Sequence, residues 1–323
     1  MAKNILITGA CGFIGSHLTD FFLKKGFRVV AYDLYNSNNL HGWLKNSKKN
    51  KNLKVVLGDI QDYKSTFQLI RKSDYVIHLA ALISIPYSYN APLSFFKTNV
   101  EGTYNLLEGC RVANKKIIIT STSEVYGSGK YFPMNESHEL NAQSPYAASK
   151  IAADQLALSY FKSYNLKVNI IRPFNAYGPR QSGRAIIPNI LKQIISKKYI
   201  KLGNIYSLRD FTYVEDLCDA YYRIFKNKKY YGKIYNTGTS KTYSILKIFN
   251  LIKKITKKNK YIKIDKQRIR PKKSEVDKLQ GDFRLIKKDL GWKPLTSIEQ
   301  GLIKTFNWVS SNTDKYNSED YDI

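Results

Sequence analysis

The chain has 323 residues, of which 43% are apolar, and its 53 Lys and Arg against 25 Asp and Glu give a formal net charge of +28. An apolar share of this size can build a buried core, which excludes a disordered tail protein. No apolar run approaches the roughly 18 residues of a membrane span, so no membrane partner is expected. The opening residues, MAKNILITGA, lack the features of a signal peptide, and a cytoplasmic location is therefore expected.

The cysteines and the distribution of charge argue against a disulfide-rich, a metal-binding or a nucleic-acid-binding protein. The three Cys are widely separated, no CxxC pair occurs, and only four His are present, so neither a disulfide framework nor a metal site is expected. The positive charge is spread along the chain, as in KKNKNLK, KKITKKNKYIK and RPKKSEVDK. Such scatter is typical of solvated lysines rather than of one nucleic-acid-binding stripe, so no nucleic acid partner is expected. A positive field would still help to gather a diphosphate-bearing substrate.

Residues 1–175 alternate short apolar runs with amphipathic helical stretches. The predicted strands are 4–9, 28–33, 54–59, 75–80, 116–121 and 167–173. This alternation is typical of parallel βαβ units, whose ligand sites lie at the carboxyl ends of the strands. We therefore predict an α/β fold with a doubly wound Rossmann sheet.

Residues 176–323 follow a less regular pattern and are predicted to form a smaller C-terminal α/β substrate-binding domain. Helices are expected at 185–198, near 244–257 and near 297–309, with a strand in KIYNTGT at 233–239. The stretch 209–232 is expected to return to the first sheet.

The segment ILITGACGFIGSHL places three glycines between the first strand and a helix. Gly9 permits a tight turn, Gly12 lets the backbone approach a pyrophosphate, and Gly15 allows close helix packing, while the helix amino end offers N–H groups to an anion. Phe13 and Ile14 open that helix and belong to the same predicted cofactor-binding turn. The strand before and the helix after supply the context that the motif requires.

Acidic residues end the next two predicted strands. Asp33 can accept hydrogen bonds from both ribose hydroxyls and would repel a 2′-phosphate, which favours NAD over NADP. Asp59 and Ile60 end the third strand, where an adenine ring is expected. A turn aspartate with no ligand remains the alternative interpretation of Asp33.

Tyr146 and Lys150 are four residues apart in SPYAASKIAADQL and therefore share a helix face. A lysine cation there can lower the pKa of the phenol, so that the tyrosine acts as a base. The spacing alone is weak, because it recurs at Tyr126/Lys130, Tyr222/Lys226 and Tyr243/Lys247. Position distinguishes Tyr146, because its helix follows the fifth strand, whose end, TSTSEVYG, carries hydroxyl groups.

Several motifs in order, including TGACGFIG, GDIQD, HLAA, NVEGTYNLLE, STSEVYG, YAASK, RPFNAYGPRQ, RDFTYVEDL and YNTGT, resemble the extended short-chain dehydrogenase/reductase family over residues 3–310. The resemblance is to its sugar-nucleotide epimerases, dehydratases and decarboxylases. It implies a cofactor site that also includes Leu79, Ala80, Ala81, Thr98, Tyr146, Lys150 and Pro173. It implies substrate contacts at Ser84, Asn175, Ile187, Arg209 and Arg270, with arginines suited to phosphate.

Within the family, YDLYNSNNLHGWL, LAALISIPYSY and QRIRPKKSEVDKLQGD are most similar to the 4,6-dehydratases of legionaminic acid biosynthesis. That likeness implies an N-acetylglucosamine linked to GDP, although the residues do not exclude UDP. Tyr146 would take the C4 hydroxyl proton while a tightly bound NAD accepts the C4 hydride and later returns it to C6. Glu124 would be the base at C5, and Thr122 would hydrogen-bond the tyrosine.

Ser123 departs from the Thr-Asp-Glu triplet of most glucose 4,6-dehydratases, in which the aspartic acid protonates the departing hydroxyl. A serine hydroxyl is a far poorer acid, so Ser123 is expected to position water or sugar. The Thr-Ser-Glu triplet resembles that of UDP-glucuronate decarboxylases, so a decarboxylase or UDP-sugar 4-epimerase stays open. A non-catalytic dinucleotide-binding or nucleic-acid-binding protein is the alternative of another class. The family likeness also implies a homo-oligomer, either a dimer or a tetramer.

Overall fold

The computed structural model describes residues 3–45 and 47–316. Its centre is a seven-stranded sheet in the order β11-β6-β5-β4-β1-β2-β3, in which every pairing is parallel. The strands are β1 (Asn4–Thr8), β2 (Arg28–Asp33), β3 (Leu53–Leu57), β4 (Tyr75–His78), β5 (Lys116–Thr120), β6 (Val168–Pro173) and β11 (Ile234–Thr237). The sequence order therefore reverses between β1 and β4, where ligands bind in sheets of this kind.

Side chains of β1 alternate between two cores, as the period of a strand requires. Ile5 and Ile7 belong to one buried cluster, and Leu6 belongs to another on the opposite face. Both faces are thus covered. The apolar runs of the central strands follow from this double burial.

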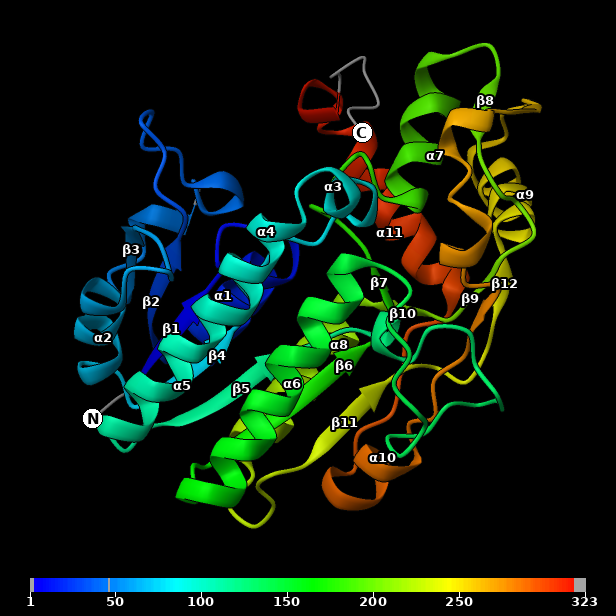
Figure 1. Cartoon of the computed structure of the whole chain (residues 1–323). Coiled ribbons are helices and arrows are strands. Elements are labelled where there is room, and N and C mark those ends of the chain that lie inside the picture. Colours follow the sequence, from blue (N-terminus) through cyan, green and yellow to red (C-terminus); the bar gives the residue numbers. More distant parts are fainter. Residues whose placement is uncertain (1–2, 46, 317–323) are drawn as a thin grey trace.

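Helices form one layer on each face of the sheet (Figure 1). The first layer contains α1 (Phe13–Lys24), α8 (Val214–Lys226) and α10 (Arg284–Leu290), whose apolar residues share a core with β1, β2 and β4. The second contains α2 (Tyr63–Arg71), α5 (Gly102–Val112) and α6 (Pro145–Tyr164). The α/β fold with a doubly wound sheet is confirmed.

A smaller lobe packs around its own core, beside the strand ends of the large sheet (Figure 1). Its helices are α7 (Ile186–Ser196), α9 (Ile245–Thr256) and α11 (Ile298–Ser310). Its short strands are β7 (Asn175–Tyr177), β8 (Ile200–Leu202), β9 (Leu208–Arg209), β10 (Phe211–Tyr213), β12 (Tyr243–Ser244), β13 (Ile262–Ile264) and β14 (Lys278–Leu279). Polar loops join these pieces, and they bring basic residues toward the large sheet.

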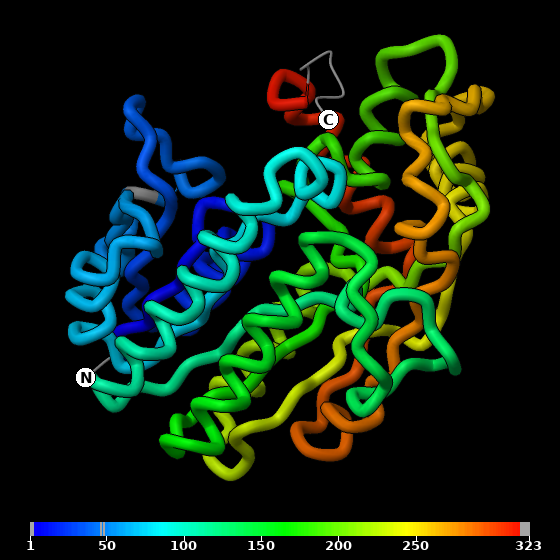
Figure 2. Tube along the Cα trace, in the orientation of Figure 1, coloured from blue at the N-terminus to red at the C-terminus, as the bar shows by residue number. Residues whose placement is uncertain are grey.

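The chain passes between the two regions more than once, which Figure 2 follows by colour. After β10 in the small lobe, α8 packs against α1, and the yellow strand β11 pairs with the green strand β6. The sequence places 233–239 in the second half, whereas the structure makes β11 the edge strand of the large sheet. A four-residue strand carries too little pattern to reveal its sheet.

Short elements lie around the ends of the strands. They are α3 (Ile85–Asn90), α4 (Pro92–Phe95), a π-helical turn η3 (Phe96–Glu101), and the 3₁₀ turns η1 (Gly42–Leu44), η2 (Ser47–Lys49), η4 (Ser123–Tyr126), η5 (Lys266–Arg268), η6 (Lys272–Ser274) and η7 (Thr313–Tyr316). Within residues 3–45 and 47–316, the search for a helix long and apolar enough to cross a membrane finds none.

Candidate active site

The glycine turn between β1 and α1 forms an open cradle. Gly9 has a φ of +65°, and a Cβ built on it would lie 2.7 Å from the Ala80 backbone nitrogen. A Cβ on Gly15 would overlap the Gly9 carbonyl oxygen, whereas one on Gly12 would have only that oxygen nearby, at 3.4 Å. Gly9 and Gly15 are thus required by conformation and by packing. Gly12 instead leaves space beside the turn.

The amino end of α1 suits a phosphate group. Gly12 is its N-cap and supplies no side-chain cap, and no acidic residue lies in the first turn, which Phe13 and Ile14 begin. Backbone N–H groups at such an end are available to an anion and are favoured by the helix dipole. The cradle therefore fits the pyrophosphate of a dinucleotide.

Asp33, at the end of β2, is tied to the glycine turn. Its carboxylate accepts hydrogen bonds from the backbone of Cys11, at 2.6 Å, and of Leu34, at 2.8 Å. Asp59 and Ile60 follow β3, and Asp59 accepts from the backbone of Gln61, at 2.9 Å. These acids stand where the sequence predicts the ribose and adenine contacts.

The carboxyl end of β4 lies against the same turn. The Thr8 hydroxyl accepts hydrogen bonds from the backbones of Leu79 and Ala80, both at 3.2 Å, and contacts His78 Nδ1 at 2.8 Å. These contacts fix the strand end beside Gly9. Ala81 continues this segment toward Ser84, which caps α3 and accepts from Tyr87, at 3.4 Å.

Tyr146 and Lys150 lie in the first half of α6, and both are buried. Ser144 caps the helix and Pro145 begins it, which fixes the start one residue before Tyr146. Lys150 Nζ donates to the Thr120 carbonyl oxygen at 2.6 Å, at the end of β5. This contact directs the ammonium group toward the strand end that carries Thr122.

Several groups act on the two titratable side chains. Burial raises the pKa of Tyr146, a hydrogen bond with the Thr122 hydroxyl lowers it, and the nearby charge of Glu124 raises it. Burial lowers the pKa of Lys150 to about 8. Burial is the main cause of both shifts, and perturbed pKa values cluster at functional sites. Thr122, Glu124 and Tyr146 are therefore brought together, as the sequence predicts.

Thr122, Ser123 and Glu124 form the entry to η4. The Thr122 hydroxyl accepts from the backbone of Glu124 at 3.2 Å, so it caps the turn. Ser123 is buried, and Glu124 is half-buried. No carboxylic acid stands at position 123, so this residue offers a hydroxyl group and no carboxyl proton donor.

The small lobe supplies the cations. Arg209 on β9 is buried and forms an ion pair with Glu275 at 3.5 Å. Burial lowers its pKa, the charge of Glu124 raises it, and the charge of Arg270 lowers it, which places these three groups in one electrostatic neighbourhood. Arg270 Nη1 is buried with no hydrogen-bond partner among the described residues. An unsatisfied guanidinium of this kind suits a phosphate ligand.

The remaining predicted residues differ in their surroundings. Asn175 on β7 has a buried side-chain oxygen without a partner in the described part of the chain, next to Pro173 at the end of β6. Thr98 is half-buried in η3. Ile187 is 1% exposed within the core of the small lobe, so only its backbone is available for a substrate contact.

Two buried charged residues next to the site escaped the sequence analysis. Asp154 lies four residues after Lys150, and Arg172 precedes Pro173; they form an ion pair at 3.0 Å. Both are at most 1% exposed. The spacing of Asp154 from Lys150 on one helix is the signal that could have found it.

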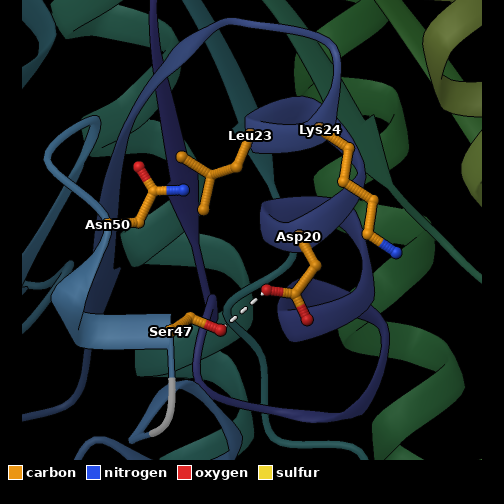
Figure 3. Close-up of a pocket in the computed structure, with 5 residues that line it drawn as sticks. All are labelled: Asp20, Leu23, Lys24, Ser47 and Asn50. Atoms are coloured by element: carbon orange, nitrogen blue, oxygen red, sulfur yellow. Dashed lines mark hydrogen bonds between the residues drawn. The ribbon is translucent and has the colours of Figure 1, made fainter.

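Cavity volume alone does not locate this site. A hollow of about 450 Å³ opens between α1 and η2, lined by Asp20, Leu23, Lys24, Ser47 and Asn50 (Figure 3). Two of its polar side chains are paired with each other, because Ser47 donates to Asp20 at 2.8 Å. None of its residues is in the predicted set, and the chemistry lies at the strand ends instead.

The glycine cradle and the buried Tyr-Lys pair on this sheet define an extended short-chain dehydrogenase/reductase. A family model described as GDP-mannose 4,6 dehydratase matches residues 6–305, and the chain belongs to that family.

Relatives within the family differ in activity. The chain is 34% identical over 318 residues to a UDP-glucuronate 4-epimerase of Thermodesulfobacterium geofontis, covering 95% of this chain and 96% of the relative. It is 33% identical over 321 residues, 96% of its length, to a trifunctional UDP-glucose 4,6-dehydratase of Arabidopsis thaliana, and it spans 48% of that protein. The dTDP-glucose 4,6-dehydratase DesIV of Streptomyces venezuelae, solved with NAD bound, superposes with a TM-score of 0.88 at 27% identity, covering 97% and 99% of the two chains.

Proposed function

We propose that the chain is an NAD-dependent 4,6-dehydratase that converts an NDP-linked N-acetylglucosamine, with GDP as the nucleotide, to the 4-keto-6-deoxy sugar. Its product would feed synthesis of a nonulosonic acid of the legionaminic type for surface glycans. The observation that carries the reaction class is the convergence of Tyr146, Thr122 and Glu124 at one strand end. The dehydratases among the relatives support the same class.

The cradle residues would hold the cofactor. The pyrophosphate would lie over Gly12 at the open end of α1, and Asp33 would bind the ribose hydroxyls. NAD supplies the acceptor for a hydride from the sugar, and no external reductant is needed when the hydride is returned within one turnover. Arg209 and Arg270 would bind the diphosphate of the substrate.

The chain's own residues would move the protons. Tyr146 takes the proton of the C4 hydroxyl, with Thr122 holding the phenol oxygen in place. Lys150 stabilises by its charge the phenolate that accepts this proton. Glu124 then removes the C5 proton, which is acidic once C4 is a ketone, and the C6 hydroxyl leaves as water with the proton that Glu124 has taken up. Ser123 orients the water or sugar hydroxyl that accompanies this departure.

A second function, 4-epimerisation or decarboxylation, is favoured by one observation. Ser123 occupies the position at which a carboxylic acid would protonate the leaving hydroxyl. An epimerase needs only proton transfer to Tyr146, hydride transfer from C4 to NAD and a return of the hydride to the other face, and the relative from Thermodesulfobacterium geofontis is an epimerase. The first proton transfer is common to both functions.

The mass of the product in deuterated water separates these functions. We expect the purified chain to remove one water from GDP-N-acetylglucosamine, with UDP-N-acetylglucosamine as comparison, and to place one solvent deuterium at C5. Loss of carbon dioxide from a uronic acid nucleotide, or an unchanged mass with inversion at C4, would overturn the dehydratase in favour of the second function.

Two variants assign the proton at C5. Glu124→Gln is expected to abolish both water loss and deuterium incorporation, because the amide cannot accept the C5 proton. Glu139→Gln is the matched control, since Glu139 is exposed and pairs with Lys130 at 2.6 Å away from the strand end. Equal loss in the two variants would contradict the role given to Glu124.

A further inference from the structure

A third functional group shares the face of α6 that carries Tyr146 and Lys150. Asp154 lies one helical turn beyond Lys150 and is 0% exposed. A carboxylate at such a depth is costly unless cations and hydrogen bonds surround it. Its contacts therefore show what it is there to interact with.

One carboxylate oxygen of Asp154 has two hydrogen-bond donors. Oδ2 accepts from Ser121 Oγ at 2.8 Å and from Arg172 Nε at 3.0 Å. Arg172 has further partners, because its Nη1 donates to the Tyr126 hydroxyl at 2.9 Å and its guanidinium lies over the Tyr126 ring. The ion pair alone could be a structural tie between α6 and β6.

The other oxygen argues against a purely structural tie. Oδ1 is buried and has no hydrogen-bond partner in the part of the chain that the structure describes. Lys150 is the next cation on the same helix face, and it is 3% exposed. Its ammonium donates to the Thr120 carbonyl oxygen and interacts electrostatically with Asp154. The Oδ1 atom of Asp154 thus makes no hydrogen bond that would account for its burial, and the charge of the carboxylate acts on the Lys150 ammonium.

We propose that Asp154 is a positioning residue that keeps Lys150 in its charged form beneath Tyr146, with Arg172 and Ser121 holding the carboxylate in place. The proposal rests on the function given above to Tyr146 and Lys150. It assigns a task to the buried Asp154–Arg172 pair beyond holding a helix on a strand.

The other titratable groups near Lys150 do not provide this anion. Arg172 on β6 is itself a cation, so its charge disfavours the positive charge of Lys150. His78 on β4 is neutral, because burial and the Lys150 charge lower its pKa to about 3. Tyr221 on α8 is a neutral phenol bonded to the Thr120 hydroxyl at 2.7 Å.

Glu124 on η4 is the remaining acid in this neighbourhood. Its charge and, to a smaller extent, that of Asp154 raise the pKa of Tyr146, so both carboxylates disfavour the phenolate that the reaction needs. A lysine held in its charged form offsets this effect at the phenol. Asp154 thus favours the charged form of Lys150, and the charge of Lys150 offsets the effect of the carboxylates on the phenol.

The physical consequence concerns pH. Burial lowers the pKa of Lys150 to about 8, and the Asp154 charge opposes this fall. Without that charge, the ammonium loses its proton at lower pH, and Tyr146 loses the neighbouring cation that favours its phenolate. The pH range in which Tyr146 has a charged lysine beside it therefore ends at a lower pH.

The first test is the pH profile of Asp154→Asn, a variant of the same shape without the charge. We expect the alkaline limb of kcat to move toward neutral pH and turnover at pH 8 to fall about tenfold, with KM little changed. Asp154→Glu keeps the charge and is expected to restore most of the wild-type profile. An unchanged profile in Asp154→Asn would overturn the proposal.

A second readout needs no turnover. Lysine labelled with ¹³C at Cε reports its own titration by NMR, and the Lys150 signal is assigned by its loss in Lys150→Met. We expect this titration to shift to lower pH in Asp154→Asn, and to stay in place in Asp216→Asn. The control removes a carboxylate that is also buried but bonds Leu295 and Thr296 in the small lobe.

The two readouts separate the two proposals. If no sugar nucleotide is turned over, the proposed function fails, whereas the NMR titration still decides the role of Asp154. If Asp154→Asn does not fold, Ser121→Ala removes one of the hydrogen bonds that hold the charged carboxylate, and it is expected to shift the Lys150 titration to lower pH. An unmoved Lys150 signal in the folded variant would overturn the proposal.

Discussion

The large sheet and the small lobe contribute different things to the site. The sheet region holds its functional groups at strand ends and helix starts, with the Tyr146 helix capped by Ser144 and the Lys150 ammonium bound to a strand carbonyl. The lobe presents Arg270 on an irregular segment between two 3₁₀ turns. In the proposed function, the chemistry that requires fixed geometry would thus be on the rigid part, and recognition of the nucleotide and sugar would be on loops. The two regions should respond differently to mutation.

Removal of the Tyr146 hydroxyl should give the largest effect and the clearest sign of the sheet's role. Tyr146→Phe is expected to lower kcat about 10²- to 10⁴-fold, because the C4 hydroxyl loses its base. KM, NAD binding and the melting temperature should change little, since the ring keeps its packing. Steady-state kinetics with product mass detection measure the first two quantities. A variant that keeps full turnover would place the base elsewhere.

Gly12→Ala tests the cofactor cradle, which also belongs to the sheet region. The added methyl would meet only the Gly9 carbonyl oxygen, at 3.4 Å, so the fold should be retained while the space for the pyrophosphate is lost. We expect NAD affinity to fall about 100-fold, because several charge-assisted hydrogen bonds are weakened together. Calorimetric titration with NAD measures it. Gly15→Ala is the contrasting variant, which should fail to fold because its methyl would overlap the turn.

Arg270→Gln tests the lobe. Its unpartnered Nη1 is expected to bind the substrate diphosphate, and a hydrogen bond to a charged group is worth about 1.5–3 kcal/mol. KM for the nucleotide sugar should therefore rise about 10- to 100-fold with kcat nearly unchanged. Lys201→Gln is the control, a lysine of the same lobe on β8. A fall in kcat with an unchanged KM would contradict the view that the lobe binds the substrate while the sheet region carries out the chemistry.

Much of the sheet region is predictable from the sequence because its signals are local. The glycine turn, Asp33 and the strand pattern all lie within short segments whose spacing follows from backbone geometry. The six predicted strands all appear in the sheet, within three residues at each end. The seventh strand, β11, was placed in the wrong region because its four residues carry no periodicity and its partner β6 lies 60 residues earlier.

The site is predictable only in part, because its remaining contacts come from distant segments. Tyr146, Thr122 and Glu124 were found through one helix and one strand end. The pairing of Asp154 with Arg172, and of Arg209 with Glu275, depends on how helices and loops pack, which residue order does not show. Ile187 was given a substrate contact by family likeness, whereas the amphipathic pattern of α7 places its side chain in the core.

The smallest predicted effect concerns Glu136, which joins the loop before α6 to the edge of the large sheet. Its Oε1 accepts from the Asn236 backbone at 2.8 Å in β11, and burial raises its pKa to about 7. A carboxyl whose pKa is higher in the folded state binds its proton more tightly there. Its contribution to stability is therefore full below its ordinary pKa of 4.5 and is lost as the pH rises through about 7.

Glu136→Gln keeps the acceptor oxygen and removes the charge. We expect the variant to be more stable than wild type by about 1–2 kcal/mol at pH 8, and the difference to vanish near pH 4, where the wild-type carboxyl holds its proton in the folded and the unfolded state. Urea unfolding at the two pH values measures it, with exposed Glu139→Gln as the control. Because Glu136 lies outside the proton path, kcat should stay at the wild-type value, so stability of the sheet edge and chemistry at the strand ends would be separable within one region. If wild type and Glu136→Gln are equally stable at both pH values, neighbouring groups rather than a bound proton compensate the charge of the buried carboxyl.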